Sequence, residues 1–62
     1  MNKEEIKQLR LNLDMSQQAF AVKLGVSLTT VNRWETGDFK PSQLAEVKLQ
    51  KLLKKVNKNG HI

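Results

Sequence analysis

Four side chains between positions 28 and 33 are of the types that can recognise the edges of nucleic-acid bases. Arg33 can donate two hydrogen bonds to a guanine, and Asn32 can pair with an adenine. Thr29 can donate or accept a hydrogen bond, and Leu28 can contact the methyl group of a thymine. Each good bidentate pair contributes on the order of 1–3 kcal/mol of discrimination between bases. The segment therefore predicts contacts with base edges in duplex DNA, if one rigid element presents all four side chains together.

A helix over residues 28–35 would present these four side chains together. At about 100° per residue they fall on one half of such a helix, whereas Val31 and Trp34 fall on the other. Because Val31 and Trp34 supply the apolar bulk of the segment, we expect them to face the core and leave the other four side chains pointing outward. The alternative is a surface helix with an ordinary mixed polar face that binds nothing.

Three further residues are candidates for contacts with the DNA backbone. Gln17 lies in the first turn after Ser16, where free backbone amides and the helix dipole favour an anion, so its amide can hold a phosphate. Lys40 and Ser42 lie in the loop after the 28–35 helix and can contact the sugar-phosphate backbone. Gln17 has an equally physical alternative, which is to hydrogen-bond back to the turn and only shape the start of the helix.

Serines and glycines delimit the two helices that must position these side chains. Ser16 and Ser27 are each placed as an N-cap, where the hydroxyl accepts a hydrogen bond from a free amide of the first turn. Gly25 can take the left-handed conformation that ends a helix, and Gly37 closes the second helix. Segment 16–37 therefore predicts a helix-turn-helix, whose second helix is the one that such motifs insert into the major groove.

Two further helices are predicted on either side of this pair. On the N-terminal side, Ile6, Leu9 and Leu13 recur at intervals of three and four, which predicts a helix over residues 3–13. On the C-terminal side, a sustained apolar stripe predicts a helix over residues 42–56.

Together these elements predict an all-α fold, a compact four-helix bundle. Residues 1–56 would form one domain, and residues 57–62 a frayed tail. Ala21 is small enough to let the two central helices nearly touch where they cross. The predicted core consists mainly of Ile6, Leu9, Met15, Phe20, Ala21, Leu24, Val26, Val31, Trp34, Leu44, Leu49 and Leu52.

Composition limits the classes of protein to which the chain can belong. At 62 residues there is room for one core, and a domain this small is only marginally stable. Cysteine is absent, and the single histidine, His61, cannot form a metal site alone, so we expect no metal and no other cofactor. No apolar run approaches the roughly 18 residues of a membrane span, and a secretory signal is lacking, so we expect a cytoplasmic protein with no membrane contact.

The net charge points to a polyanionic partner without choosing one. Eleven Lys and Arg residues against six Asp and Glu residues give +5, which attracts nucleic acid, acidic proteins or anionic lipid. For a small protein, solubility explains this charge equally well. Two alternatives are likewise open for the lysines of the last helix, which either contact phosphates or form a solvated helix face. These lysines are Lys48, Lys51, Lys54, Lys55 and Lys58.

The combined pattern is that of a known family. The run SQQAFAVKLGVS, followed by TTVNRWETG and the later proline, resembles the Cro and lambda-repressor-like helix-turn-helix family, also called XRE-type regulators. The resemblance covers the chain from about Ile6 to Leu53. It implies a compact bundle of four or five helices that binds operator DNA, as a homodimer on a palindromic site.

The resemblance also implies roles for individual residues. Gln17 matches the glutamine that contacts phosphate at the start of the family's second helix, and Arg10 with Glu35 matches a pair between the first and third helices. If that pair is partly buried, removing Glu35 alone leaves an uncompensated charge. The family's base-reading positions fall on Leu28, Thr29, Asn32 and Arg33. Glutamines are frequent at the first two of these positions in the family, so the identity of the contacts does not transfer.

These observations predict a sequence-specific transcriptional regulator, acting as a repressor, whose partner is double-stranded DNA. The alternative is a protein-binding helical module, such as an antitoxin or an adaptor, whose last helix seats a partner such as a toxin and whose DNA affinity is secondary. An enzyme is the least expected class, because the body of the domain has no histidine, no cysteine and no glycine-rich phosphate loop.

Overall fold

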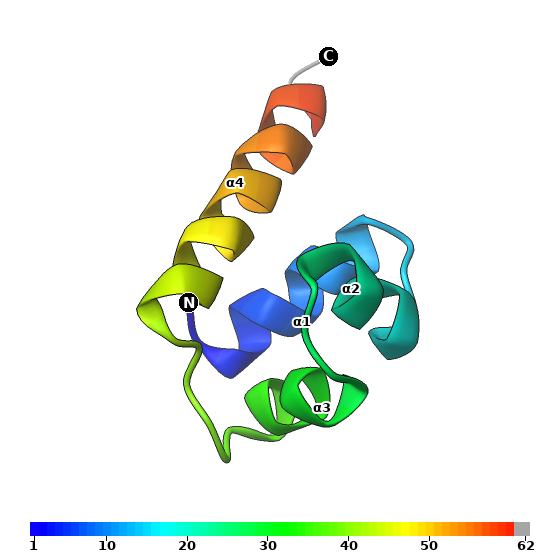
Figure 1. Cartoon of the computed structure of the whole chain (residues 1–62). Coiled ribbons are helices and arrows are strands. Elements are labelled where there is room, and N and C mark those ends of the chain that lie inside the picture. The colour runs from blue at the N-terminus through cyan, green and yellow to red at the C-terminus, as the bar shows by residue number, and fades with distance from the viewer. Residues whose placement is uncertain (61–62) are drawn as a thin grey trace.

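The computed structural model describes the backbone of residues 1–60 and the side chains of residues 1–56. These residues form four α-helices (Figure 1), which are α1 (Lys3–Asn12), α2 (Gln17–Leu24), α3 (Leu28–Thr36) and α4 (Gln43–Gly60). The all-α four-helix fold predicted from the sequence is therefore confirmed.

Helices α2 and α3 begin where the sequence places their caps. The hydroxyl of Ser16 accepts a hydrogen bond from the amide of Ala19, and the hydroxyl of Ser27 accepts one from the amide of Thr30. Helix α1 has a cap that the sequence analysis did not identify, a capping box in which the side chain of Asn2 and that of Glu5 each accept from the other residue's amide.

Each of the first three helices ends in a compact turn. Gly25 and Gly37 both take the left-handed conformation, with φ of 72° and 89°, which an L-residue with a Cβ adopts only at a cost. The predicted first helix is one residue too long, because α1 ends at Asn12 and Leu13 is its C-cap. Asp14 completes that turn with a positive φ of 58°.

One core holds the four helices together. Phe20, Val31 and Leu49 are fully buried at its centre, and Ala21 is buried in α2 at 1% exposure, as its small size predicts. Met15 and Val26 are partly buried against this core. The complete set of buried residues is Ile6, Leu9, Phe20, Ala21, Leu24, Val31, Trp34, Ala45, Leu49 and Leu52.

The inclusion of Leu44 in the predicted core is wrong. Its side chain is 68% exposed, and the neighbouring Ala45 is buried instead. The reason is the helical period, because Ala45, Leu49 and Leu52 are spaced four and three residues apart and so share one face of α4. Leu44 lies about 100° away from that face.

The helices are arranged so that α3 keeps one face open. Helix α3 packs against α1 and α2, whereas α4 packs against α1 and α2 and extends away from α3 (Figure 1). Within the described residues, none of the helices is both long and apolar enough to cross a membrane. Helix α4 continues past Val56 to Gly60, and residues 61–62 lie outside the described part, so the fraying of 57–62 stays a prediction.

Candidate nucleic-acid interface

The outward face of α3 carries all four candidate base-contacting residues. Val31 and Trp34, on the opposite face, are 0% and 3% exposed and fix the rotation of the helix against the core. Exposed on the outward face are Leu28, Thr29, Asn32 and Arg33. Because the buried anchors and the exposed set share one nine-residue helix, the four side chains project from a rigid support.

Arg33 has a neighbour that sequence reasoning missed. Its guanidinium carbon lies 4.9 Å from the centre of the Phe39 ring, and Phe39 itself is 51% exposed. An arginine over an aromatic ring at an exposed site gains about 0.5–1 kcal/mol. The stack therefore restrains Arg33 without removing its guanidinium from solvent.

The position of Phe39 is set by the end of α3. The carbonyl oxygen of Arg33 accepts hydrogen bonds from the amides of Asp38 and Phe39, at 3.0 and 3.3 Å, as well as from the amide of Gly37 at 3.1 Å. The hydroxyl of Thr36 donates to the same oxygen at 3.1 Å. The loop thus folds back onto Arg33, which places the aromatic ring beside the guanidinium of the same residue. The signal available in the sequence was an aromatic residue two positions after the helix-ending Gly37.

Arg10 and Glu35, the pair that the family resemblance implies, are joined by a two-point contact. Nε of Arg10 lies 2.7 Å from Oε2 of Glu35, and Nη2 lies 3.0 Å from Oε1. The remaining Nη1 donates to the carbonyl of Met15 at 3.0 Å. The side chains are only 12% and 5% exposed, so this pair ties α1 to α3 from within the structure.

The protonation of this pair follows from its geometry. Burial by itself raises the pKa of Glu35, but hydrogen bonds from Arg10 and Gln17 outweigh it and leave that pKa below the ordinary value. The hydrogen bond to Glu35 raises the pKa of Arg10. Both groups are therefore charged at neutral pH.

Gln17 makes a contact that neither sequence-based alternative includes. Its side-chain nitrogen donates to Oε1 of Glu35 at 3.1 Å, so the residue joins α2 to α3 and is half-buried. An amide nitrogen carries two donors, and the bond to Glu35 uses one of them. The phosphate contact of Gln17 stays a prediction, and the structure adds that this contact would couple directly to the Arg10–Glu35 pair.

The loop after α3 contributes the other two candidate phosphate-contacting residues. Lys40 is exposed and follows Phe39 directly. Ser42 is also exposed, and its hydroxyl accepts a hydrogen bond from the amide of Ala45 at 3.2 Å, which makes it a cap of α4. Its hydroxyl hydrogen remains a donor for a phosphate. Among the residues that the structure describes, no group of three His, Cys, Asp or Glu is placed to hold a metal ion, and His61 lies outside them.

Comparison with known families decides the identity of this arrangement. Residues 6–58 match the model of the helix-turn-helix family, and this range contains all of α2 and α3 and most of α1 and α4. The chain belongs to the Cro and lambda-repressor-like, XRE-type helix-turn-helix family. This family consists of DNA-binding regulators, so membership points to DNA as the partner of the helix-turn-helix protein and to regulation rather than catalysis. No curated protein and no solved structure matches the chain.

Proposed function

We propose that this helix-turn-helix protein is a sequence-specific transcriptional repressor that reads the major groove with α3. The observation that carries the proposal is the division of α3 into a buried face, held by Val31 and Trp34, and an exposed face of base-contacting side chain types. A repressor acts by occupying its operator, which requires affinity and specificity but no further chemistry from the chain. Such a protein would act in the cytoplasm, where it meets DNA.

In this proposal the residues divide into two groups. Leu28, Thr29, Asn32 and Arg33 contact base edges and set the sequence preference. Gln17, Lys40 and Ser42 contact phosphates and set the register of the protein on the duplex. Support for the second group comes from their positions, at the first turn of α2 and in the exposed loop after α3.

The small size of the recognition surface supports binding as a homodimer. One copy with a nine-residue recognition helix makes few base contacts, so we propose that two copies bind a palindromic operator. Their half-sites would then be centred about 34 Å apart, one turn of DNA, so that both copies face the same side of the duplex.

Selection from a pool of random duplexes tests the proposal. We expect enrichment of one motif with two inverted halves, and binding to that motif should survive an excess of competitor DNA. The logarithm of its affinity should fall linearly with the logarithm of the salt concentration, because phosphate contacts release counterions. A pool that shows no enrichment at low salt would contradict the proposal.

A further inference from the structure

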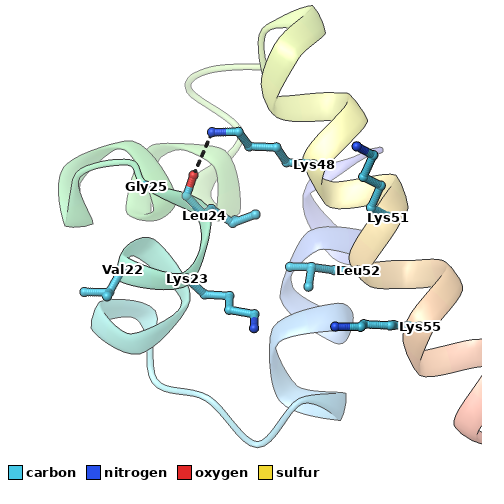
Figure 2. Close-up of a pocket in the computed structure, with 8 residues that line it drawn as sticks. All are labelled: Val22, Lys23, Leu24, Gly25, Lys48, Lys51, Leu52 and Lys55. Atoms are coloured by element: carbon cyan, nitrogen blue, oxygen red, sulfur yellow. Dashed lines mark hydrogen bonds between the residues drawn. The ribbon is translucent and has the colours of Figure 1, made fainter.

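A groove between α2 and α4 lies outside the proposed DNA-binding surface. It has a volume of about 510 Å³ and is open to solvent along one side. Figure 2 shows that α2 supplies one wall and α4 the other. Residues 22–25 line it from α2 and its end, and Lys48, Lys51, Leu52 and Lys55 line it from α4. We call this feature the α2–α4 groove.

The charge of the α2–α4 groove is entirely positive. Four of its eight lining residues are lysines, and none is acidic. Among the described side chains, the ion pairs join Met1 to Glu46 and Arg10 to Glu35, so no groove lysine has a carboxylate partner there. Lys23 and Lys55 extend toward the gap from opposite walls (Figure 2), which places like charges around one space. An anion between them would relieve this repulsion.

One lysine has a structural task that separates it from the others. Nζ of Lys48 donates to the carbonyl oxygen of Leu24 at 3.2 Å, and so satisfies a backbone group at the end of α2 (Figure 2). This bond holds α2 and α4 at one end of the groove. Lys48 keeps two donors and its charge, but its position is fixed by this bond, so the lysines that can move toward a ligand are Lys23, Lys51 and Lys55.

The floor of the α2–α4 groove is apolar. Leu24 and Leu52 are 4% and 9% exposed and form its base, whereas Val22 is 70% exposed at its edge, with its side chain directed away from α4 (Figure 2). On α4, the groove residues Lys48, Lys51, Leu52 and Lys55 recur at intervals of three, one and three, which is a single helical face. A partner with the same period would meet lysines one turn apart and an apolar residue between them.

We propose that the α2–α4 groove docks an acidic amphipathic helix of a protein partner. Carboxylates spaced one helical turn apart would pair with Lys51 and Lys55 of α4 and with Lys23 of α2. Apolar side chains of the same helix would cover Val22 and the exposed edge of Leu52. This is the helix-in-groove mode of recognition, with charge complementarity choosing the partner.

Two other occupants fit the groove less well. A DNA phosphate would satisfy the lysines, but it offers no apolar surface to the Leu24 and Leu52 base of the groove, and the candidate base-contacting side chains lie on α3 rather than at this groove. A small anionic ligand would stay largely exposed in a groove open along one side, whereas sites for small molecules bury most of the ligand surface. The proposal does not depend on the DNA-binding function, because the two surfaces use different residues.

The test uses a synthetic helical peptide of about 16 residues, long enough to populate a helix, with glutamates and leucines spaced to give one acidic and one apolar edge. A second peptide has the same composition in scrambled order, so that its charge is equal but it has no amphipathic face. Both are titrated into the isotope-labelled protein at physiological salt and followed by amide chemical shifts. We expect the first peptide to shift residues 22–25 and 48–55 and to leave 28–33 unchanged.

Adjacent lysines of α4 provide a matched pair of variants. Lys55→Glu reverses a charge inside the α2–α4 groove, and Lys54→Glu reverses one on an exposed residue of the same helix outside it. We expect Lys55→Glu to weaken peptide binding about tenfold, because reversal replaces an attraction with a repulsion, and Lys54→Glu to weaken it far less. Val22→Ser tests the apolar contact. Its control is Leu11→Ser, which makes a similar change at an exposed leucine of α1. Circular dichroism of each variant checks that it is folded.

Three results would overturn the proposal. Equal binding of the scrambled peptide, or equal losses in Lys54→Glu and Lys55→Glu, would show attraction by net charge alone. Shifts in the groove on addition of operator duplex but not of the helical peptide would assign the lysines to phosphate contact. Loss of peptide binding in Lys55→Glu with unchanged enrichment of a DNA motif would support the groove as a second, separate surface.

Discussion

Arg10 and Arg33 are the two arginines of the chain, and their surroundings are opposite. Arg10 has a 12% exposed side chain, makes a two-point contact with Glu35 and donates to a backbone carbonyl. Arg33 is exposed, and its guanidinium lies over the face of the Phe39 ring. The first arginine has its hydrogen-bonding capacity committed to the fold, whereas the second keeps its donors available to a ligand. Residue type alone therefore does not distinguish a structural arginine from a recognition arginine, but the partners do.

The largest expected effect comes from breaking the structural pair. Glu35→Ala leaves Arg10 partly buried without its carboxylate, and we expect the free energy of unfolding to fall by about 3 kcal/mol. Urea denaturation followed by the fluorescence of Trp34, the single tryptophan, measures this loss. Glu35→Gln keeps an acceptor for Arg10 and should lose less. A stability within about 0.5 kcal/mol of wild type in Glu35→Ala would show that the pair contributes little.

Removing the other arginine should produce the converse result. Arg33→Ala is expected to lower the free energy of unfolding by no more than about 1 kcal/mol, because the side chain is exposed and loses only its stack on Phe39. Its affinity for the selected operator should fall by about 1–3 kcal/mol, with relaxed preference at one base position. Fluorescence anisotropy with matched and mismatched duplexes gives both values. A uniform loss on all sequences would assign Arg33 to phosphate contact instead.

Acid should weaken the Arg10–Glu35 pair by protonating Glu35, while both arginines keep their charge. Hydrogen bonds from Arg10 and Gln17 hold the folded-state pKa of Glu35 below its ordinary value despite burial, which opposes them. The ionised pair therefore adds stability above the unfolded-state pKa of about 4.3, and this stability is lost as the pH falls through the lower folded-state pKa. We expect the wild-type unfolding free energy to fall more steeply below about pH 4.3 than that of Glu35→Gln. Parallel curves for the two proteins would contradict this account.

A second acidic residue, Glu46, also responds to acid but does not affect this comparison. The hydrogen bond from the ammonium group of Met1 lowers the pKa of Glu46, so this residue also contributes to the loss of stability in acid. Because Glu46 is unchanged in both proteins, its contribution cancels in the difference between them.

The smallest expected effect concerns the ring beside Arg33. Phe39→Leu keeps an apolar side chain in the loop but removes the aromatic face, so we expect at most about 1 kcal/mol of lost operator affinity and a loss of unfolding free energy no larger than the stack itself, about 0.5–1 kcal/mol. In the Arg33→Ala background the same substitution should have no further effect on affinity. A double-mutant cycle measures this coupling, and additive losses would show that Phe39 does not act through Arg33.

Local signals in the sequence were sufficient to predict most of the fold. The N-caps at Ser16 and Ser27 and the left-handed helix ends at Gly25 and Gly37 involve only backbone groups nearby in the chain. Their roles can therefore be assigned without knowledge of the tertiary structure. The orientation of α3 was also predictable, because one tryptophan and one valine dominate its apolar surface. Leu44 was misassigned because two adjacent apolar residues, Leu44 and Ala45, offered alternative registers at the start of α4, and the larger one lies outside the core.

Contacts between segments far apart in the chain were less accessible to sequence reasoning. The bond from Gln17 to Glu35 depends on how α2 crosses α3, and the stack of Phe39 on Arg33 depends on a loop folding back onto one carbonyl oxygen. The α2–α4 groove likewise requires the packing of α4 against α2, since the three groove lysines of α4 lie 25 or more residues from Lys23 of α2. Family resemblance supplied the Arg10–Glu35 pair, which the residues alone left as unrelated charges.

The central claim is that Arg33 donates to a guanine in the major groove, and replacement of single guanines in the selected operator by 7-deazaguanine tests it directly. That base lacks the N7 acceptor but pairs normally, so its effect reports on a major-groove contact. At one position per half-site we expect wild-type protein to lose about 1–2 kcal/mol of affinity and Arg33→Ala to lose none. An equal loss in both proteins, or no loss at any guanine, would contradict the claim.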